Sequence, residues 1–398
     1  MQEHTVPPLA DKLHCTGCSA CHNICPHSAI KVVERNGGFY YPEVDEEKCV
    51  SCGLCEKTCP AISPENTAAI SKAYMFKASD DAVVYNSSSG GMFTVLAEWI
   101  LEKKGVVYGA RYDYQARRLE HSGTDECGLE ELKKSKYIES YIGDTYKKVR
   151  KNLKDGRYVL FVGTPCQVSG LYKYLGSLNA SDRLITVDFV CHGVPSNQHF
   201  SEYIRYQERK NASSLVHFDF RPKEKGWKGN IFKMQFDDGK ILSQPFIKNL
   251  YYYAFNNNWM LRESCYNCSI LKTTLSDITI GDFWGVKNMP EYKDDNKGIS
   301  VVIAHSAKGE AVMKLIRKDN FSRELSYADI DYIYEDRSRD SRYDLGRRQQ
   351  LLKEVSERNY VHVVKYHYWK EMIWHRLRMS VSEKAKAILR LLGLWKRK

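Results

Sequence analysis

The sequence predicts an α/β (α+β) protein in which a small cysteine-rich domain precedes a mixed, largely parallel α/β domain. Eight of the 13 cysteines lie in the first 60 residues, in two runs with identical spacing. After them, short apolar strands alternate with helical segments, which is the pattern of a sheet covered by helices. We divide the 398 residues into a domain at 1–62, a second domain whose two parts are 72–165 and 166–336, and a basic helical tail at 337–398.

The two cysteine runs each read C-x-x-C-x-x-C-x-x-x-C-P. This is the spacing of bacterial ferredoxins with two 4Fe-4S clusters, in which three cysteines of a run bind one cluster and the fourth binds the other. One cluster is therefore assigned to Cys15, Cys18, Cys21 and Cys59, and the other to Cys49, Cys52, Cys55 and Cys25. We expect the fourth cysteine of each run to start a helix, and we expect a hairpin from Ala29–Val33 and Phe39–Tyr41.

These cysteines have two alternative uses. Zinc sites usually combine two C-x-x-C pairs rather than two runs of four. A disulfide framework belongs in a secreted chain, and the polar segment Met1–His14 does not resemble a signal peptide. The duplicated run with both prolines favours a ferredoxin-like module with two cubane clusters, which carry single electrons.

Composition and charge narrow the class of protein further. No stretch of 18 apolar residues is present, so we expect no membrane-spanning segment. Thirteen cysteines without a signal peptide indicate a reducing compartment, and we expect a cytoplasmic protein. The net charge of +11 is concentrated at the end, because ten Lys or Arg face two Glu between Val361 and Lys398. Since the rest of the chain is close to neutral, we expect no nucleic-acid partner.

A serine- and glycine-rich loop opens a helix in the second domain. Ser87 to Gly91 precedes a helix predicted over Met92–Lys104, and strands are predicted at Ala73–Phe76 and Val106–Ala110. Free backbone N–H groups at the start of such a helix suit a phosphate. The same sequence is equally typical of a plain N-cap and turn.

Two cysteines follow the ends of two predicted buried strands. The strand Arg157–Val162 leads to Cys166, and the strand Leu184–Val190 leads to Cys191. Each cysteine alone could be an inert buried thiol. Because ligands of open α/β sheets bind at the carboxyl ends of the strands, the matched placement indicates a site.

A lone C-x-x-C pair follows at Cys265 and Cys268. With Cys166 and Cys191 it provides four further thiols, the number that one more cubane needs. A zinc ion fits the same count, and a redox-active pair is the third alternative. The two upstream clusters favour a third 4Fe-4S cluster, and Cys127 is expected to be a structural thiol.

A basic, aromatic loop contains Arg221, Lys223 and Trp227. This loop would suit an anionic cofactor or substrate. It could equally be a solvated loop with one core tryptophan, and the charges alone do not distinguish between the two interpretations. Further strands are predicted at 216–220, 231–236, 241–246 and 298–305, and helices at 146–153, 168–175 and 308–319.

The tail is charged and helical from Tyr343 onward. Ile388, Leu391, Leu392 and Trp395 line one side of a short basic helix. Such a helix can rest on an anionic membrane surface or bind a partner protein. It can equally pack on its own domain or fray.

Together these motifs resemble the beta-subunit family of coenzyme F420 hydrogenases and dehydrogenases, with a ferredoxin module in front. The resemblance covers about residues 72–310, and its most specific parts are the Gly-Thr-Pro-Cys-Gln and Cys-His-Gly segments. The matching residues are Ser89-Gly90-Gly91 with Thr94, Ser135-Lys136-Tyr137, Gly163 to Gln167, Cys191 to Pro195, Gly226-Trp227, Cys265 with Cys268, and Gly281 to Gly285.

The resemblance implies a flavin-binding α/β domain that holds FAD beside a 4Fe-4S cluster. It implies hydride exchange with F420, or reduction of another organic substrate, including one of a polysaccharide pathway, with ferredoxin or another redox partner. The flavin contacts it implies are Ser89, Gly90, Gly91, Thr94, Lys136, Tyr137, Thr164 and Gln167. Lys136 would hold a phosphate or the electron-rich edge of the reduced ring. His192 is the candidate proton donor, or else a histidine bonded to backbone.

The sequence therefore predicts an iron–sulfur flavoprotein oxidoreductase. No G-x-G-x-x-G motif follows a strand, so no Rossmann nicotinamide site is evident. A second hypothesis replaces F420 by a glycan-related or other organic substrate. A third is a non-catalytic electron-transfer subunit that delivers electrons to a partner enzyme, and a fourth is a zinc-binding scaffold protein.

Overall fold

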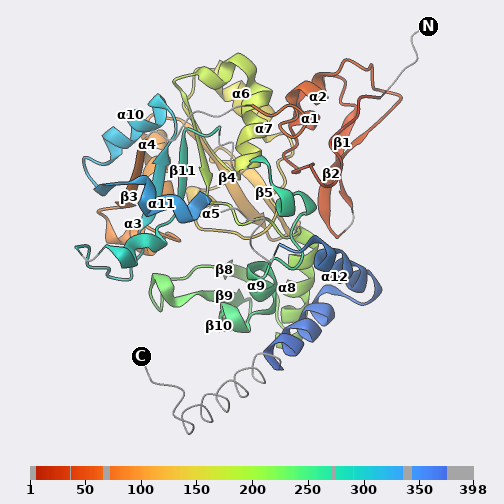
Figure 1. Cartoon of the computed structure of the whole chain (residues 1–398), viewed down its shortest axis with the longest axis vertical. Coiled ribbons are helices and arrows are strands. Elements are labelled where there is room, and N and C mark those ends of the chain that lie inside the picture. The colour runs from red at the N-terminus through yellow and green to blue at the C-terminus, as the bar shows by residue number, and fades with distance from the viewer. Residues whose placement is uncertain are drawn as a thin grey trace, which may run out of the picture.

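The structure is a computed structural model that describes residues 6–35, 37–65, 72–270, 275–289, 291–334 and 343–373. A small N-terminal domain packs on one side of a larger α/β body (Figure 1). A second, smaller sheet and its helices lie below the body in this view. The predicted fold class, a small N-terminal domain followed by a mixed α/β domain, is confirmed.

The N-terminal domain consists of α1 (Ala20–Ile24), the antiparallel pair β1 (Ile30–Arg35) and β2 (Phe39–Val44), and α2 (Leu54–Thr58). The predicted hairpin is thus present. The expectation that the fourth cysteine of each run starts a helix is wrong, because Cys25 and Cys59 are the C-caps of α1 and α2 and have extended backbones. The helix must end there, since a residue before proline is disfavoured in the α conformation.

The α/β body is built on one eight-stranded sheet with the order β13-β3-β12-β11-β7-β6-β4-β5. The four central strands β11, β7, β6 and β4 are parallel, and the flanking strands are antiparallel. The strands are β3 (Lys72–Lys77), β4 (Val106–Asp113), β5 (Arg118–Gly123), β6 (Val159–Val162), β7 (Leu184–Phe189), β11 (Ile278–Asp282), β12 (Ser300–Ala304) and β13 (Phe321–Leu325).

Helices cover both faces of this sheet because alternate strand residues point to opposite sides. On β6, Leu160 packs under α4 and α10, whereas Val159 and Phe161 pack under α6 and α7. The helices of the body are α3 (Asp81–Tyr85), α4 (Met92–Glu102), α5 (Leu129–Leu132), α6 (Thr145–Lys154), α7 (Pro165–Leu175), α10 (Ala307–Ile316) and α11 (Tyr327–Ile330). Its 3-10 helices are η1 (Gly176–Ala180), η4 (Glu263–Asn267), η6 (Trp284–Asn288) and η7 (Asp331–Tyr334).

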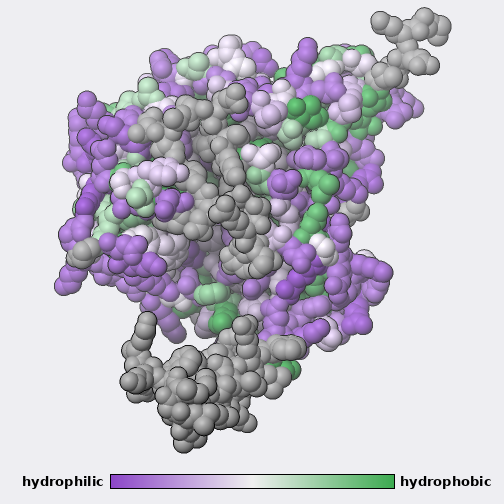
Figure 2. Space-filling model, in the orientation of Figure 1, coloured by the Kyte–Doolittle hydropathy of each residue, from purple (hydrophilic) through white to green (hydrophobic). Residues whose placement is uncertain are grey.

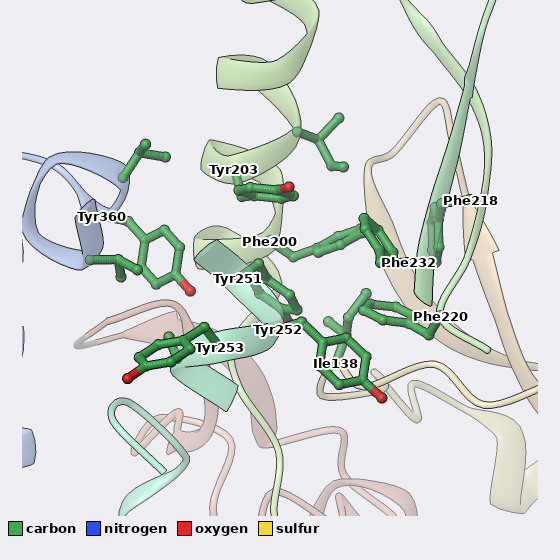
Figure 3. Packing of buried hydrophobic residues seen from close by; sticks show 14 of the residues in the cluster. Ile138, Phe200, Tyr203, Phe218, Phe220, Phe232, Tyr251, Tyr252, Tyr253 and Tyr360 are labelled. Atoms are coloured by element: carbon green, nitrogen blue, oxygen red, sulfur yellow. The ribbon is translucent and has the colours of Figure 1, made fainter. Parts of the chain in front are cut away.

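The second sheet is the antiparallel order β10-β9-β8, which agrees with the predicted strands and hairpin. Its strands are β8 (Leu215–Asp219), β9 (Ile231–Phe236) and β10 (Ile241–Pro245), with η2 (Trp227–Gly229), η3 (Phe246–Lys248), α8 (Asn197–Asn211), α9 (Leu250–Asn256) and α12 (Leu345–Glu357) around them. Between them lies a cluster of buried aromatic rings (Figure 3), in which the centroids of Phe200 and Tyr251 are 4.9 Å apart.

The described part of the tail packs on this aromatic cluster. Residues 360–373 are helical, and Tyr360 is buried with its ring stacked on His199. The predicted apolar face at Ile388, Leu391, Leu392 and Trp395 lies outside the described residues. Among the helices that are described, none has both the length and the apolar character needed to cross a membrane.

The surface is mainly hydrophilic on the face that Figure 2 shows, and hydrophobic residues gather there over the N-terminal domain. Val50 and Leu54 in this domain are 54% and 38% exposed, and Cys52 between them is exposed as well.

Candidate functional site

A cavity of about 260 Å³ lies at the carboxyl ends of the parallel strands β6, β7 and β11, and we call it the large cavity. This is the edge at which open α/β sheets bind ligands. Of the residues that the sequence singled out for cofactor contact or catalysis, the structure brings these to its wall: Ser89, Gly91, Thr94, Lys136, Tyr137, Thr164, Gln167 and His192.

The serine-rich loop before α4 is held in place by hydrogen bonds. Ser88 Oγ accepts from the Ser135 N–H at 2.8 Å, and Ser89 Oγ donates to the Ile299 carbonyl at 2.8 Å. Lys223 Nζ donates to the carbonyl oxygens of Val84 and Ser89, both at 2.5 Å. The loop therefore presents a fixed set of hydroxyl and backbone groups to the large cavity.

Gly90 is the predicted contact that does not reach the wall of the large cavity. Its N–H donates to Ser300 Oγ at 2.9 Å, and a Cβ atom there would overlap the Phe76 carbonyl oxygen. Gly90 thus lets the loop pack directly on β3 and β12.

Lys134 and Lys136 line the large cavity, and Arg221 and Lys223 lie behind its wall. Lys136 Nζ donates to the Lys133 carbonyl at 2.7 Å, and desolvation lowers the pKa of Lys136 to about 8. Arg221, which is 6% exposed, donates through Nη1 to Asp282 Oδ2 at 2.9 Å, while its buried Nη2 has no hydrogen-bond partner among the described residues. Lys134 pairs with Asp219 at 2.6 Å.

Lys134, Lys136, Arg221 and Lys223 thus set four basic groups against the two carboxylates of Asp219 and Asp282. Of the basic loop that the sequence left open, Arg221 and Lys223 are buried behind the wall of the large cavity, whereas Lys228 is exposed. Trp227 is 2% exposed and stacks on Trp284 with ring centroids 4.4 Å apart.

The start of α7 carries Thr164 and Gln167, which form a capping box. The Thr164 N–H donates to Gln167 Oε1 at 3.0 Å, and Gln167 Nε2 donates to the Ser140 carbonyl at 3.1 Å. The helix begins at Pro165, three residues earlier than predicted, because proline suits the first helical position. Cys166 therefore lies in the first turn of α7, with its Sγ 3.0 Å from Thr164 Oγ1.

A second cavity, of about 40 Å³, is lined by Cys166, Cys191, Cys265 and Cys268, and we call it the central cysteine cavity. Burial, followed by the neighbouring Cys191, raises the pKa of Cys166 well above its ordinary value. This cavity and the large cavity share part of their walls. The shared residues are Ser140, Thr164, Gln167, Cys191, Gly193 and Val194.

The N-terminal domain has two further small cavities, each lined by four cysteines. The inner cavity, about 30 Å³, is lined by Cys15, Cys18, Cys21 and Cys59, and the outer cavity, about 20 Å³, by Cys25, Cys49, Cys52 and Cys55. These are the same sets that the spacing assigns to two clusters. Thr16 and Gly17 line both the inner cavity and the central cysteine cavity.

Two thiols of the inner cavity have pKa values raised by burial. Burial raises the pKa of Cys18 to about 12 and places that of Cys21 well above its ordinary value. No two of the 13 cysteines, all of them in the described residues, form a disulfide. Within the described residues no three Cys, His, Asp or Glu side chains form a group that could hold a single metal ion.

Cys127 lies apart from the four cavities. It is half-buried and packs on the core under α4, with its Sγ 3.5 Å from the Gly123 carbonyl.

Two histidines line the large cavity. The His192 ring lies 5.0 Å from the Phe255 ring, and the Tyr343 hydroxyl donates to the His192 carbonyl at 2.8 Å. His121 was not predicted, because β5 has no apolar alternation that would indicate a strand. Its Nε2 lies 3.0 Å from the Val162 carbonyl, and burial lowers the pKa of His121 to about 4, so the neutral ring donates through Nε2.

Two protein-family models match parts of the chain. Residues 156–326 match the C-terminal domain of the coenzyme F420 hydrogenase/dehydrogenase beta subunit, and residues 14–62 match the 4Fe-4S dicluster domain. No curated protein matches the sequence.

Among solved structures, the chain is similar to one of the F420-reducing [NiFe] hydrogenase complex from Methanosarcina barkeri, studied by xenon derivatization. The two chains are 16% identical with a TM-score of 0.46, and the similarity covers 74% of this chain and 94% of that one. The chain thus combines a region that matches the C terminus of the coenzyme F420 hydrogenase/dehydrogenase beta subunit with an N-terminal region that matches the 4Fe-4S dicluster domain.

Proposed function

We propose that the chain is an iron–sulfur flavoprotein oxidoreductase that moves electrons between FAD and 4Fe-4S clusters. Hydride exchange with F420, or reduction of an organic substrate such as one of a polysaccharide pathway, would be coupled to this transfer. The observation that carries the proposal is the series of shared walls. The large cavity adjoins the central cysteine cavity, which adjoins the inner cavity, and α1 and α2 link the inner and outer cavities.

The large cavity fits a flavin dinucleotide in chemistry. Its volume approaches the lower end of the range for small-molecule sites, about 300–1,000 Å³. Lys134 and Lys136 in its wall suit a pyrophosphate, and the start of α4 offers backbone N–H donors. A bound flavin would link two-electron hydride chemistry to the single-electron steps of clusters.

The three cysteine cavities fit polynuclear clusters. Each places four thiols around a space rather than around one point. Thiols must lose their protons to bind iron, and buried ones do so only when a cation offsets the lost hydration. Burial raises the pKa of Cys18 and of Cys166, so these thiols would bind iron only where the cluster itself offsets the cost of their deprotonation.

Lys136 and His192 are the proposed acting side chains in the large cavity. Lys136 would place a positive charge against the anionic part of the flavin or its substrate, with Nζ oriented by the Lys133 carbonyl. His192 lines the large cavity and would hold a proton there, next to Cys191, which lines both cavities.

The test is to count iron, sulfide and flavin in anaerobically purified protein, and then to titrate its visible spectrum with reduced F420, NADPH and reduced ferredoxin. About twelve irons and one FAD per chain, with rapid bleaching by one donor, is the expected result. Iron without labile sulfide would contradict the proposal and favour a zinc- or iron-binding scaffold. Turnover of substrate by the isolated chain would establish an enzyme.

The second candidate is a non-catalytic subunit that passes electrons to a partner enzyme. Its support is the exposed Cys52 in the outer cavity, flanked by the exposed apolar residues Val50 and Leu54. About eight irons and no flavin would favour this candidate over the first.

A further inference from the structure

The interface between the N-terminal domain and the α/β body contains one fully buried arginine. Arg262 belongs to the body and is 0% exposed, yet most of its guanidinium contacts lie in the N-terminal domain. Its Nε donates to the Cys15 carbonyl and its Nη2 to the Tyr40 carbonyl, both at 2.8 Å. Nη2 also lies 3.6 Å from Cys15 Sγ, within the range of an N–H···S hydrogen bond.

Glu139 is the counter-ion of Arg262 and is itself 5% exposed. Its Oε1 pairs with Arg262 Nη1, and its Oε2 accepts from the Tyr40 N–H at 3.3 Å. Gly17, which lines both the inner and the central cysteine cavities, packs on this pair. A Cβ atom at Gly17 would lie 2.8 Å from both Arg262 Nη1 and Glu139 Oε1, so the cysteine loop needs glycine here.

The backbone of Arg262 is hydrogen-bonded to two residues in the wall of the central cysteine cavity, Val194 and Cys265. Its N–H donates to the Val194 carbonyl at 2.8 Å, and its carbonyl accepts from the Cys265 N–H at 3.0 Å. One side chain thus reaches from the loop of Cys265 to the sulfur of Cys15, between the two cysteine sets.

We propose that Arg262 and Glu139 set the reduction potential of the cluster at Cys15, Cys18, Cys21 and Cys59, with Arg262 raising it and Glu139 lowering it. The inference rests on the proposed function, because it requires the clusters. Reduction adds one negative charge to a cluster, so a nearby positive charge and an N–H···S bond favour the reduced form. A buried carboxylate disfavours it, and both effects are strong because little water screens them.

The competing explanation is that the pair only joins the two domains. A buried ion pair is a weak source of stability, since desolvation offsets most of the attraction. A purely structural pair would leave the potentials unchanged whenever the clusters are retained. Potentials measured on the loaded chain therefore separate the two explanations, whereas activity alone would not.

The experiment uses full-length, anaerobically purified protein and the variants Arg262→Gln, Arg262→Lys and Glu139→Gln. Each is titrated with dithionite while EPR follows the one-electron reduction of every cluster. Two further variants, Cys52→Ser and Cys268→Ser, perturb the outer and the central cluster respectively. The reduction step that neither variant changes is then assigned to the inner cluster. The matched control is Arg117→Gln, since Arg117 forms a bidentate pair with Glu208 at 2.8 and 3.0 Å away from the cysteine cavities.

We expect Arg262→Gln to lower the reduction equilibrium constant of the inner cluster at least tenfold, a shift of about 59 mV for one electron. Glu139→Gln is expected to raise this equilibrium constant, and Arg117→Gln to leave it unchanged. The value for Arg262→Lys is expected to lie between those of Arg262→Gln and the wild type. If Arg262→Gln loses the inner cluster, the direction of the Glu139→Gln shift decides the question.

Unchanged potentials, or shifts of the same sign in Arg262→Gln and Glu139→Gln, would overturn the inference while leaving the proposed function intact. If the wild-type protein contained no iron and no sulfide, the proposed function itself would be refuted. The iron and sulfide contents are therefore measured before any titration.

Discussion

Asp188 makes the stability of the α/β body depend on pH. Its carboxyl group lies on β7, is 1% exposed and is hydrogen-bonded to the Thr279 hydroxyl. Burial raises the pKa of Asp188 from 3.8 to about 7. Between these values the folded chain holds a proton that the unfolded chain has released, so the free energy of unfolding falls as pH rises. At about 1.4 kcal/mol per pKa unit, the loss approaches about 4 kcal/mol by pH 7.

Asp188→Asn removes this titration and keeps an oxygen that can accept from Thr279. We expect the variant to gain stability relative to the wild type as pH rises from 5 to 8. Domains of this size shift their melting temperature by about 2–4 °C per kcal/mol, so the difference between the two proteins should change by several degrees. Thermal unfolding of both proteins at each pH is the assay, because comparing them cancels the contributions that they share, including cluster loss.

The control is Asp237→Asn in the turn between β9 and β10. Asp237 is exposed, and its hydrogen bond with Ser213 lowers its pKa below 3.8, so it does not titrate between pH 5 and 8. The melting temperature of Asp237→Asn should therefore change with pH in parallel with that of the wild type across this range. The same parallel behaviour in Asp188→Asn would refute the argument from burial.

Three other changes test the site and the core. Cys268→Ala should lower the iron content from about twelve to about eight atoms per chain and leave flavin bound, because Cys268 lines the central cysteine cavity but not the large cavity. An unchanged iron content would exclude Cys268 as a ligand. The affinity for flavin should weaken above pH 8 as Lys136 loses its proton, and Lys136→Arg should abolish this decline when flavin binding is followed by fluorescence titration. If the decline persists in the variant, another group is responsible for it. Phe200→Ala should lower the free energy of unfolding by about 3–5 kcal/mol in a thermal unfolding experiment, because Phe200 is fully buried among aromatic rings. Phe321 is 42% exposed, so Phe321→Ala should change this free energy little. Equal losses in the two variants would contradict the core assignment.

Local patterns in the sequence were sufficient for much of the architecture. The apolar runs at 159–162 and 184–189 are strands, and the cysteines after them line one cavity, because parallel strands end at a common edge. The edge strands β5 and β13 were missed, since RLEHSG and FSREL are too polar to show the alternation of a half-buried strand.

Long-range contacts were beyond reach of the sequence. Arg262 and Glu139 are 123 positions apart, and neither lies in a motif that would indicate a buried ion pair. His121 and Asp282 reach the large cavity only through the packing of β5 and β11. The metal-ligand and flavin-contact roles of the individual residues, and the domain boundaries, stay predictions.

The exposure of Cys52 has a consequence for handling the protein. A thiolate that a redox partner can approach is also open to dioxygen and peroxide, whereas Cys15 and Cys18 are buried. Damage by air should therefore begin at the outer end of the series and proceed inward. On the proposed function, a preparation briefly exposed to oxygen would lose its outer cluster first and keep its flavin and its other clusters. It would then retain most of its colour but no longer accept electrons from external donors.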